Sequence, residues 1–133
     1  NPVNLFVAKF LGTPPINVFD GAVKAGSLYI GDDKVLDVPG VDDREVYVGI
    51  RPEGFELDDN GPLHCKISNV EVMGRDVSIV STNPASMNPL IRSIINADNK
   101  VDITKQTVTY RVKPHKFFLF NKETEERIRY EVK

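Results

Sequence analysis

Apolar residues follow a helical period at the start of this chain and a two-residue period over the rest. Over residues 1–12 they recur at steps of three and four, which is typical of one face of an α-helix: Val3, Phe6, Val7, Phe10 and Leu11. Asn1 and Pro2 suit the start of a helix, and Gly12 suits its end. The pattern therefore predicts a helix over residues 1–12, which the prolines that follow at positions 14 and 15 bring to an end.

From Ile16 onward, short apolar runs alternate with polar positions and are separated by Gly, Pro, Asn and Asp, which predicts about ten short strands. The clearest strand covers residues 107–112, where Val108, Tyr110 and Val112 share one face. Near residues 68–69 the apolar phase slips by one residue, as a β-bulge requires. Residues 90–95 fit either a helical turn or a strand, and their β-branched content favours a strand.

Together these elements predict a mainly β fold with one N-terminal helix. Four-to-seven-residue strands at this spacing are typical of Greek-key barrels of the oligonucleotide/oligosaccharide-binding (OB) type. We expect residues 1–15 to form the helix and a linker, and residues 16–133 to form one or two OB-like barrels.

One predicted strand, over residues 117–120, carries large apolar side chains on both of its faces. The core can take Phe117 and Leu119, or Phe118 and Phe120, because alternate residues point to opposite sides of a strand. The other face is then covered either by the N-terminal helix or by another chain, and the sequence leaves both possibilities open.

Composition narrows the function. The chain has 133 residues, which fits one domain, and its net charge of −2 gives no basic face for gripping nucleic acid. A single cysteine, Cys65, excludes an internal disulfide and fits a reducing cytoplasm. No apolar run approaches the ~20 residues that cross a bilayer. Because the chain begins without Met or a signal peptide, we expect it to be a piece of a longer protein.

The common catalytic and metal-binding patterns are not found in the sequence. It lacks the Gly-x-x-x-x-Gly-Lys-Ser/Thr loop that binds nucleotide phosphates. His64 and Cys65 point to opposite faces of one strand, and His115 is isolated, so no zinc set is expected. A calcium loop starting at Glu56 would need a Glu at its twelfth position, where the chain has Ile67. We therefore expect no catalytic, cofactor-binding or metal-binding residue here.

Four segments resemble one known family. They are Pro-x-Asn-x-Phe-Val-Ala-x-Phe-Leu-Gly-Thr-Pro-Pro-Ile-Asn over 2–17, Val-Gly-Ile-Arg-Pro-Glu over 48–53, Val-Glu-Val-Met-Gly-Arg-Asp over 70–76, and Phe-Leu-Phe-Asn-Lys-Glu-Thr over 118–124, followed by Arg-Ile at 127–128. In this order, they are similar to the C-terminal regulatory region, including the TOBE module, of ATP-binding subunits of sugar-type ABC importers.

The resemblance implies a regulatory and dimerisation domain with an OB-like fold, with the TOBE module at about residues 44–131. It implies that ATP and Mg²⁺ bind in a nucleotide-binding domain outside these residues, and that none binds here. The implied partners are a second copy of the protein, the transporter's membrane subunits and possible regulation by a sugar phosphotransferase protein. The implied location is the cytoplasmic side of the cell membrane.

The matching positions carried over from the family are Gly49, Arg51, Pro52, Glu53 and Gly74, and we expect their role to be structural. We expect Arg51 and Glu53 on one strand face, with Pro52 ending the ladder, and Gly74 in a turn. A second set is the candidate subunit or regulatory interface: Phe118, Phe120 and Asn121. Asn121 departs from the family's usual Asp, which weakens any inference about regulatory contacts there.

Two other functions compete with this one. A TOBE domain of the molybdate type would bind oxyanions at a subunit interface, and stabilisation by molybdate would support it; its typical Ser-Ala-Arg-Asn-x-Leu opening is absent. A barrel for single-stranded nucleic acid would need exposed aromatics among Lys and Arg, and the chain has no Trp.

Overall fold

The computed structural model describes residues 16–87, 89–96, 106–113, 116–124 and 127–128. These residues form eleven strands and one short 3₁₀ turn, arranged as two antiparallel sheets. The mainly β, OB-like prediction is confirmed. The helix predicted over residues 1–12 and the linker to residue 15 lie outside the described residues.

The first sheet has six strands in the order β11-β10-β4-β1-β2-β3. Their bounds are β1 Asn17–Lys24, β2 Ser27–Ile30, β3 Asp33–Asp37, β4 Arg44–Ile50, β10 Phe117–Asn121 and β11 Arg127–Ile128. Strands β1 and β2 are joined by a two-residue turn at Ala25 and Gly26, whose φ angles are 51° and 76°. Two successive positive φ angles match the right-handed twist of the flanking strands, so the turn sets the register of this hairpin.

The second sheet has five strands in the order β5-β9-β6-β7-β8. Their bounds are β5 Phe55–Leu57, β6 Leu63–Met73, β7 Asp76–Thr82, β8 Ile91–Asn96 and β9 Thr107–Val112. Its edge strands β5 and β8 contact each other, so the sheet curls into a nearly closed barrel. The predicted bulge is confirmed by a register shift between Ile67 and Asn69. The ambiguous residues 90–95 fall largely in strand β8, with Ile91 and Ile95 buried.

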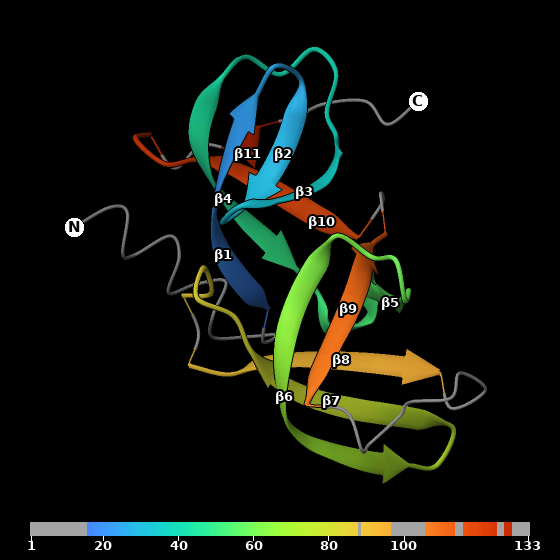
Figure 1. Cartoon of the computed structure of the whole chain (residues 1–133). Coiled ribbons are helices and arrows are strands. Elements are labelled where there is room, and N and C mark those ends of the chain that lie inside the picture. The colour runs from blue at the N-terminus through green and yellow to red at the C-terminus, as the bar shows by residue number, and fades with distance from the viewer. Residues whose placement is uncertain (1–15, 88, 97–105, 114–115, 125–126, 129–133) are drawn as a thin grey trace.

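The barrel is inserted between two neighbouring strands of the first sheet. Strand β4 leaves that sheet through the 3₁₀ turn η1 (Pro52–Gly54) into β5, and the chain returns after β9 as β10. Strands β4 and β10 pair directly, with Ile50 opposite Phe117. Figure 1 shows the six-stranded sheet in the upper half of the view and the five-stranded sheet below it, with β1 reaching down toward the barrel.

Buried residues of both sheets form one continuous core. Three aromatic rings cross it from β1 through β5 to β9. The ring of Phe19 lies 6.5 Å from that of Phe55, which lies 5.0 Å from that of Tyr110. The hydroxyl of Tyr110 shares a 2.6 Å hydrogen bond with the Ser93 hydroxyl, and both residues are fully buried. Burial raises the pKa of Tyr110 well above its ordinary range. The two sheets therefore depend on the same packed interior.

Candidate functional site

The Gly-Ile-Arg-Pro-Glu segment forms the crossover from the first sheet to the second. Gly49 lies in β4, opposite Val18 on one side and Phe118 on the other. Arg51 follows the strand, and its carbonyl accepts a 2.8 Å hydrogen bond from the amide of Gly54, which closes η1. Pro52 suits the first position of this turn because it needs no amide donor there.

The expectation that Arg51 and Glu53 share one strand face is wrong. Strand β4 ends at Ile50, and Glu53 lies exposed within η1. The physical reason is the next residue, Gly54. A Cβ at that position would lie 2.8 Å from the Lys116 carbonyl oxygen, so the backbone of the returning chain packs where a side chain would stand. Gly54 is a structural position that the sequence analysis missed.

Arg51 reaches back over the outer face of the first sheet, the face turned away from the main core. Its guanidinium carbon lies 5.5 Å from the centre of the half-buried Phe118 ring, within the range of a cation–π contact. Since Phe118 pairs with Gly49, the fold brings together three of the sequence-predicted positions: Gly49, Arg51 and Phe118.

The register of β10 with β4 decides how the two faces of residues 117–120 are used. Phe117 and Leu119 enter the main core. Phe120 is 4% exposed on the opposite side, where it belongs to a separate outer-face cluster: Ile16, Val18, Tyr47 and Phe120. Phe118 packs at the margin of this cluster. Of the three candidate interface residues, Phe120 is thus buried within the chain, while part of the Phe118 side chain stays exposed to solvent.

Asn121 shapes the turn after β10. Its Oδ1 accepts hydrogen bonds from the backbone amides of Glu123 at 2.9 Å and Thr124 at 3.3 Å, a short-range turn that Asn and Asp side chains both form. Asn can therefore stand in place of the family's Asp without loss of these two hydrogen bonds. Next to it, the Lys122 ammonium lies 2.7 Å from Asp20 and 5.4 Å from the Tyr47 ring centre. The hydrogen bond to Asp20 raises the pKa of Lys122 above its ordinary value.

Gly74 lies far from these residues, at the tip of the hairpin between β6 and β7. Its φ of 63° is a left-handed conformation that glycine adopts without strain. Met73 pairs with Asp76 across this two-residue turn. The structure thus places Gly74 in a hairpin turn.

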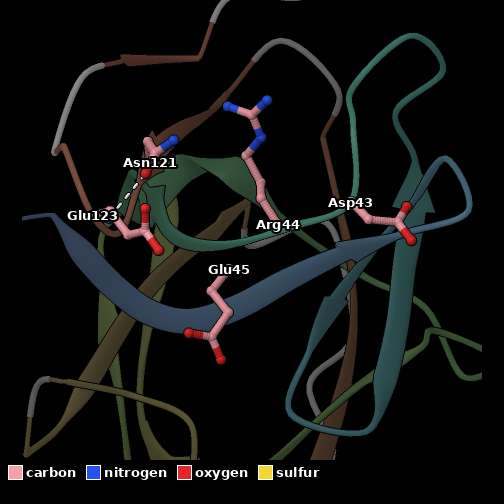
Figure 2. Close-up of a pocket in the computed structure, with 5 residues that line it drawn as sticks. All are labelled: Asp43, Arg44, Glu45, Asn121 and Glu123. Atoms are coloured by element: carbon pink, nitrogen blue, oxygen red, sulfur yellow. Dashed lines mark hydrogen bonds between the residues drawn. The ribbon is translucent and has the colours of Figure 1, made fainter.

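A cavity of about 370 Å³ opens beside the β10–β11 turn, lined by Asp43, Arg44, Glu45, Asn121 and Glu123. Figure 2 shows that the Arg44 guanidinium and the carboxylates of Glu45 and Glu123 point in different directions. Asp43 accepts a 2.8 Å hydrogen bond from the Ala25 amide. The described part of the chain has no group of three or more His, Cys, Asp or Glu side chains that could hold a metal ion. The cavity is a mixed-charge surface recess whose groups do not converge on one point.

Several import ATP-binding proteins are similar in sequence to this chain. No protein-family model matches the chain. The oligosaccharides import ATP-binding protein MsmX of Bacillus subtilis is 32% identical over 96% of the chain. The xylose/arabinose import ATP-binding protein XacJ of Haloferax volcanii is 30% identical over 92%. An sn-glycerol-3-phosphate import ATP-binding protein UgpC of a Ruegeria species is 34% identical over 55%.

The chain is homologous to part of the ATP-binding subunits of ABC-type importers. This confirms the resemblance to ATP-binding subunits of sugar-type importers, while the assignment of the matched part as a regulatory region with a TOBE module stays a prediction. The matched segment makes up 38% of the Bacillus protein, 36% of the Haloferax protein and 21% of the Ruegeria protein, so the chain spans less than two fifths of these relatives' length. Among the described residues, no helix is long and apolar enough to span a bilayer.

Proposed function

We propose that this chain is the regulatory and dimerisation domain of the ATP-binding subunit of an ABC transporter that imports carbohydrate. One observation carries the proposal: an oligosaccharides import ATP-binding protein matches 96% of the chain, which covers only 38% of that relative. In this proposal the longer protein hydrolyses ATP in residues outside the chain, where ATP and Mg²⁺ bind, and this domain performs no catalysis.

The proposed partner of the domain is a second copy of itself. The surface that favours this contact is the Arg51–Phe118 pair, where a cationic group lies over a half-buried aromatic ring beside the outer-face cluster. Aromatic and arginine side chains are enriched at protein interfaces because they combine large contact area with hydrogen-bonding capacity. The proposed complex also contains the transporter's membrane subunits, which hold the protein at the cytoplasmic face of the membrane. A phosphotransferase-system protein is a candidate regulator of this complex.

To test whether the chain belongs to a longer ATP-hydrolysing importer subunit, the native protein is isolated with an antibody raised against this chain. We expect a polypeptide much longer than 133 residues that hydrolyses ATP with Mg²⁺. A native protein of this chain's own length, without ATP hydrolysis, would refute the proposal.

The dimer is tested separately by sedimentation of the native protein and its variants. Phe118→Asp is expected to shift the native protein from dimer toward monomer. Val72→Asp is the matched control, because Val72 is 72% exposed at the β6–β7 hairpin, on the other sheet. A monomeric unmodified protein, or equal effects of the two substitutions, would count against the proposed contact.

A further inference from the structure

The first half of β1 is bonded to both sheets at once. On one side, residues 17–23 pair with β4. On the other side, only Gly21–Lys24 pairs with β2. The preceding residues turn to the loop between β7 and β8: the amide of Asp20 donates to the Ala85 carbonyl at 2.8 Å, and the amide of Met87 donates to the Val18 carbonyl at 2.8 Å. Strand β1, the first strand among the described residues, therefore connects the first sheet with the loop between β7 and β8.

Asn17, the first residue of β1, is 4% exposed and uses its side-chain amide as if it were a peptide group. Its Nδ2 donates to the Arg92 carbonyl at 2.8 Å, and its Oδ1 accepts from the Arg92 amide at 2.9 Å. This exchange of two hydrogen bonds is the pattern of a paired residue in an antiparallel ladder. The side chain thus closes the edge of β8.

The same amide also contacts the other sheet. Nδ2 donates a second hydrogen bond, 3.1 Å long, to the carbonyl of Ile50, the last residue of β4 before the crossover. Only an uncharged amide has both the donors and the acceptor for these three bonds: Asp lacks the donors, and Ala lacks all of them. Because Asn17 itself pairs with Ile50 in the β1–β4 ladder, its two bonds to Arg92 connect β8 to β4 through β1, and the bond to the Ile50 carbonyl attaches the same side chain directly to the end of β4.

We propose that Asn17 is the joint that couples the two sheets, so that a displacement of the chain at the start of β1 moves β4 and β8 together. Asn17 is a positioning residue in this proposal. The coupling deepens the proposed function. A regulatory domain within a longer protein must transmit a change in its position to the segment that precedes it in the sequence. The biological role of the coupling rests on the proposed function, whereas the coupling itself depends only on contacts within this chain.

Amide hydrogen exchange of the isolated chain, followed residue by residue by NMR, tests the joint. In Asn17→Ala, we expect exchange at the amides of Arg92 and Met87 to accelerate by about tenfold or more, because the bonds that hold them open locally. The amide of Val38, which donates to the Gly26 carbonyl at the far end of the first sheet, should keep its rate. Asn69→Ala is the matched control, because Asn69 is exposed.

If the alanine variant does not fold, the unmodified chain in low denaturant provides the measurement. The amides of Arg92, Met87 and Gly54 should then exchange through one opening with a common free energy and a common dependence on denaturant. Separate openings for these amides, or equal acceleration of Val38 and Arg92 in the alanine variant, would overturn the coupling. Hydrogen exchange does not depend on ATP hydrolysis. The coupling can therefore be supported even if the proposed importer function is refuted, and it can be refuted even if that function is supported.

Discussion

The hydrogen bond between Tyr110 and Ser93 offers a quantitative test of the barrel interior. The two hydroxyls are 2.6 Å apart, and the Ser93 hydroxyl also donates to the Ile79 carbonyl at 3.3 Å. Tyr110→Phe removes one hydroxyl but leaves Ser93 its carbonyl acceptor, so we expect a loss of about 1–2 kcal/mol in the free energy of unfolding. Ser93→Ala leaves the buried Tyr110 hydroxyl without this partner and should cost about 1–3 kcal/mol.

The double variant should cost less than the sum of the single ones, because removing both polar groups leaves neither of them unpaired. We expect a coupling energy of about 1 kcal/mol. The assay is urea unfolding followed by circular dichroism, since the chain has no Trp to report by fluorescence. Tyr29→Phe, at a half-buried position in β2, is the control and should change the free energy by no more than about 0.5 kcal/mol. Strictly additive losses would refute the assignment of this pair as a coupled buried bond.

Three further predictions follow from local features. Burial raises the pKa of Cys65 from 9.0 to about 11, so the unfolded chain loses this proton first, and the free energy of unfolding should fall between about pH 9 and 11; urea titrations should show a smaller fall for Cys65→Val. Ala25 has a φ of 51°, a conformation that Asn tolerates better, so Ala25→Asn should raise the free energy of unfolding by about 0.5 kcal/mol. An unchanged melting temperature would contradict this expectation. Gly54→Ala should lose about 1–3 kcal/mol through overlap with the Lys116 carbonyl, and more than Gly49→Ala, whose nearest contact would be a flexible side-chain atom at 3.3 Å.

Periodicity predicted the strands because most of them have one face in the core and the other toward solvent. The alternation at Val108, Tyr110 and Val112 corresponds to burial of all three side chains. The phase slip near residue 68 corresponds to the bulge. Such signals are local, and each strand carries its own.

Contacts between distant residues left no comparable signal in the sequence. Asn17 and Arg92 are 75 positions apart, and nothing near either residue shows that a side-chain amide completes the edge of a strand. The cavity residues 43–45 meet Asn121 and Glu123 only because β4 and β10 pair across 66 intervening residues, residues 51 to 116. The apolar run at 117–120 showed that both faces would be covered, but the choice of core face depended on that same pairing. The turn over Pro52–Gly54 was missed for a related reason, because the close approach of the Lys116 backbone to Gly54 depends on the return of the chain after β9.

The placement of β5–β9 between β4 and β10 has a consequence for how this architecture can vary. The two ends of the inserted barrel lie together, since Ile50 faces Phe117 and the amide of Lys113 donates to the Gly54 carbonyl at 2.8 Å. Segments whose ends meet can change in length without displacing the strands that flank them. The row of packed rings formed by Phe19, Phe55 and Tyr110 limits how far the inserted barrel can change, because it joins the barrel to the first sheet. Loops of the barrel are free to lengthen or shorten, while its deletion would leave Phe19 of the host sheet facing water.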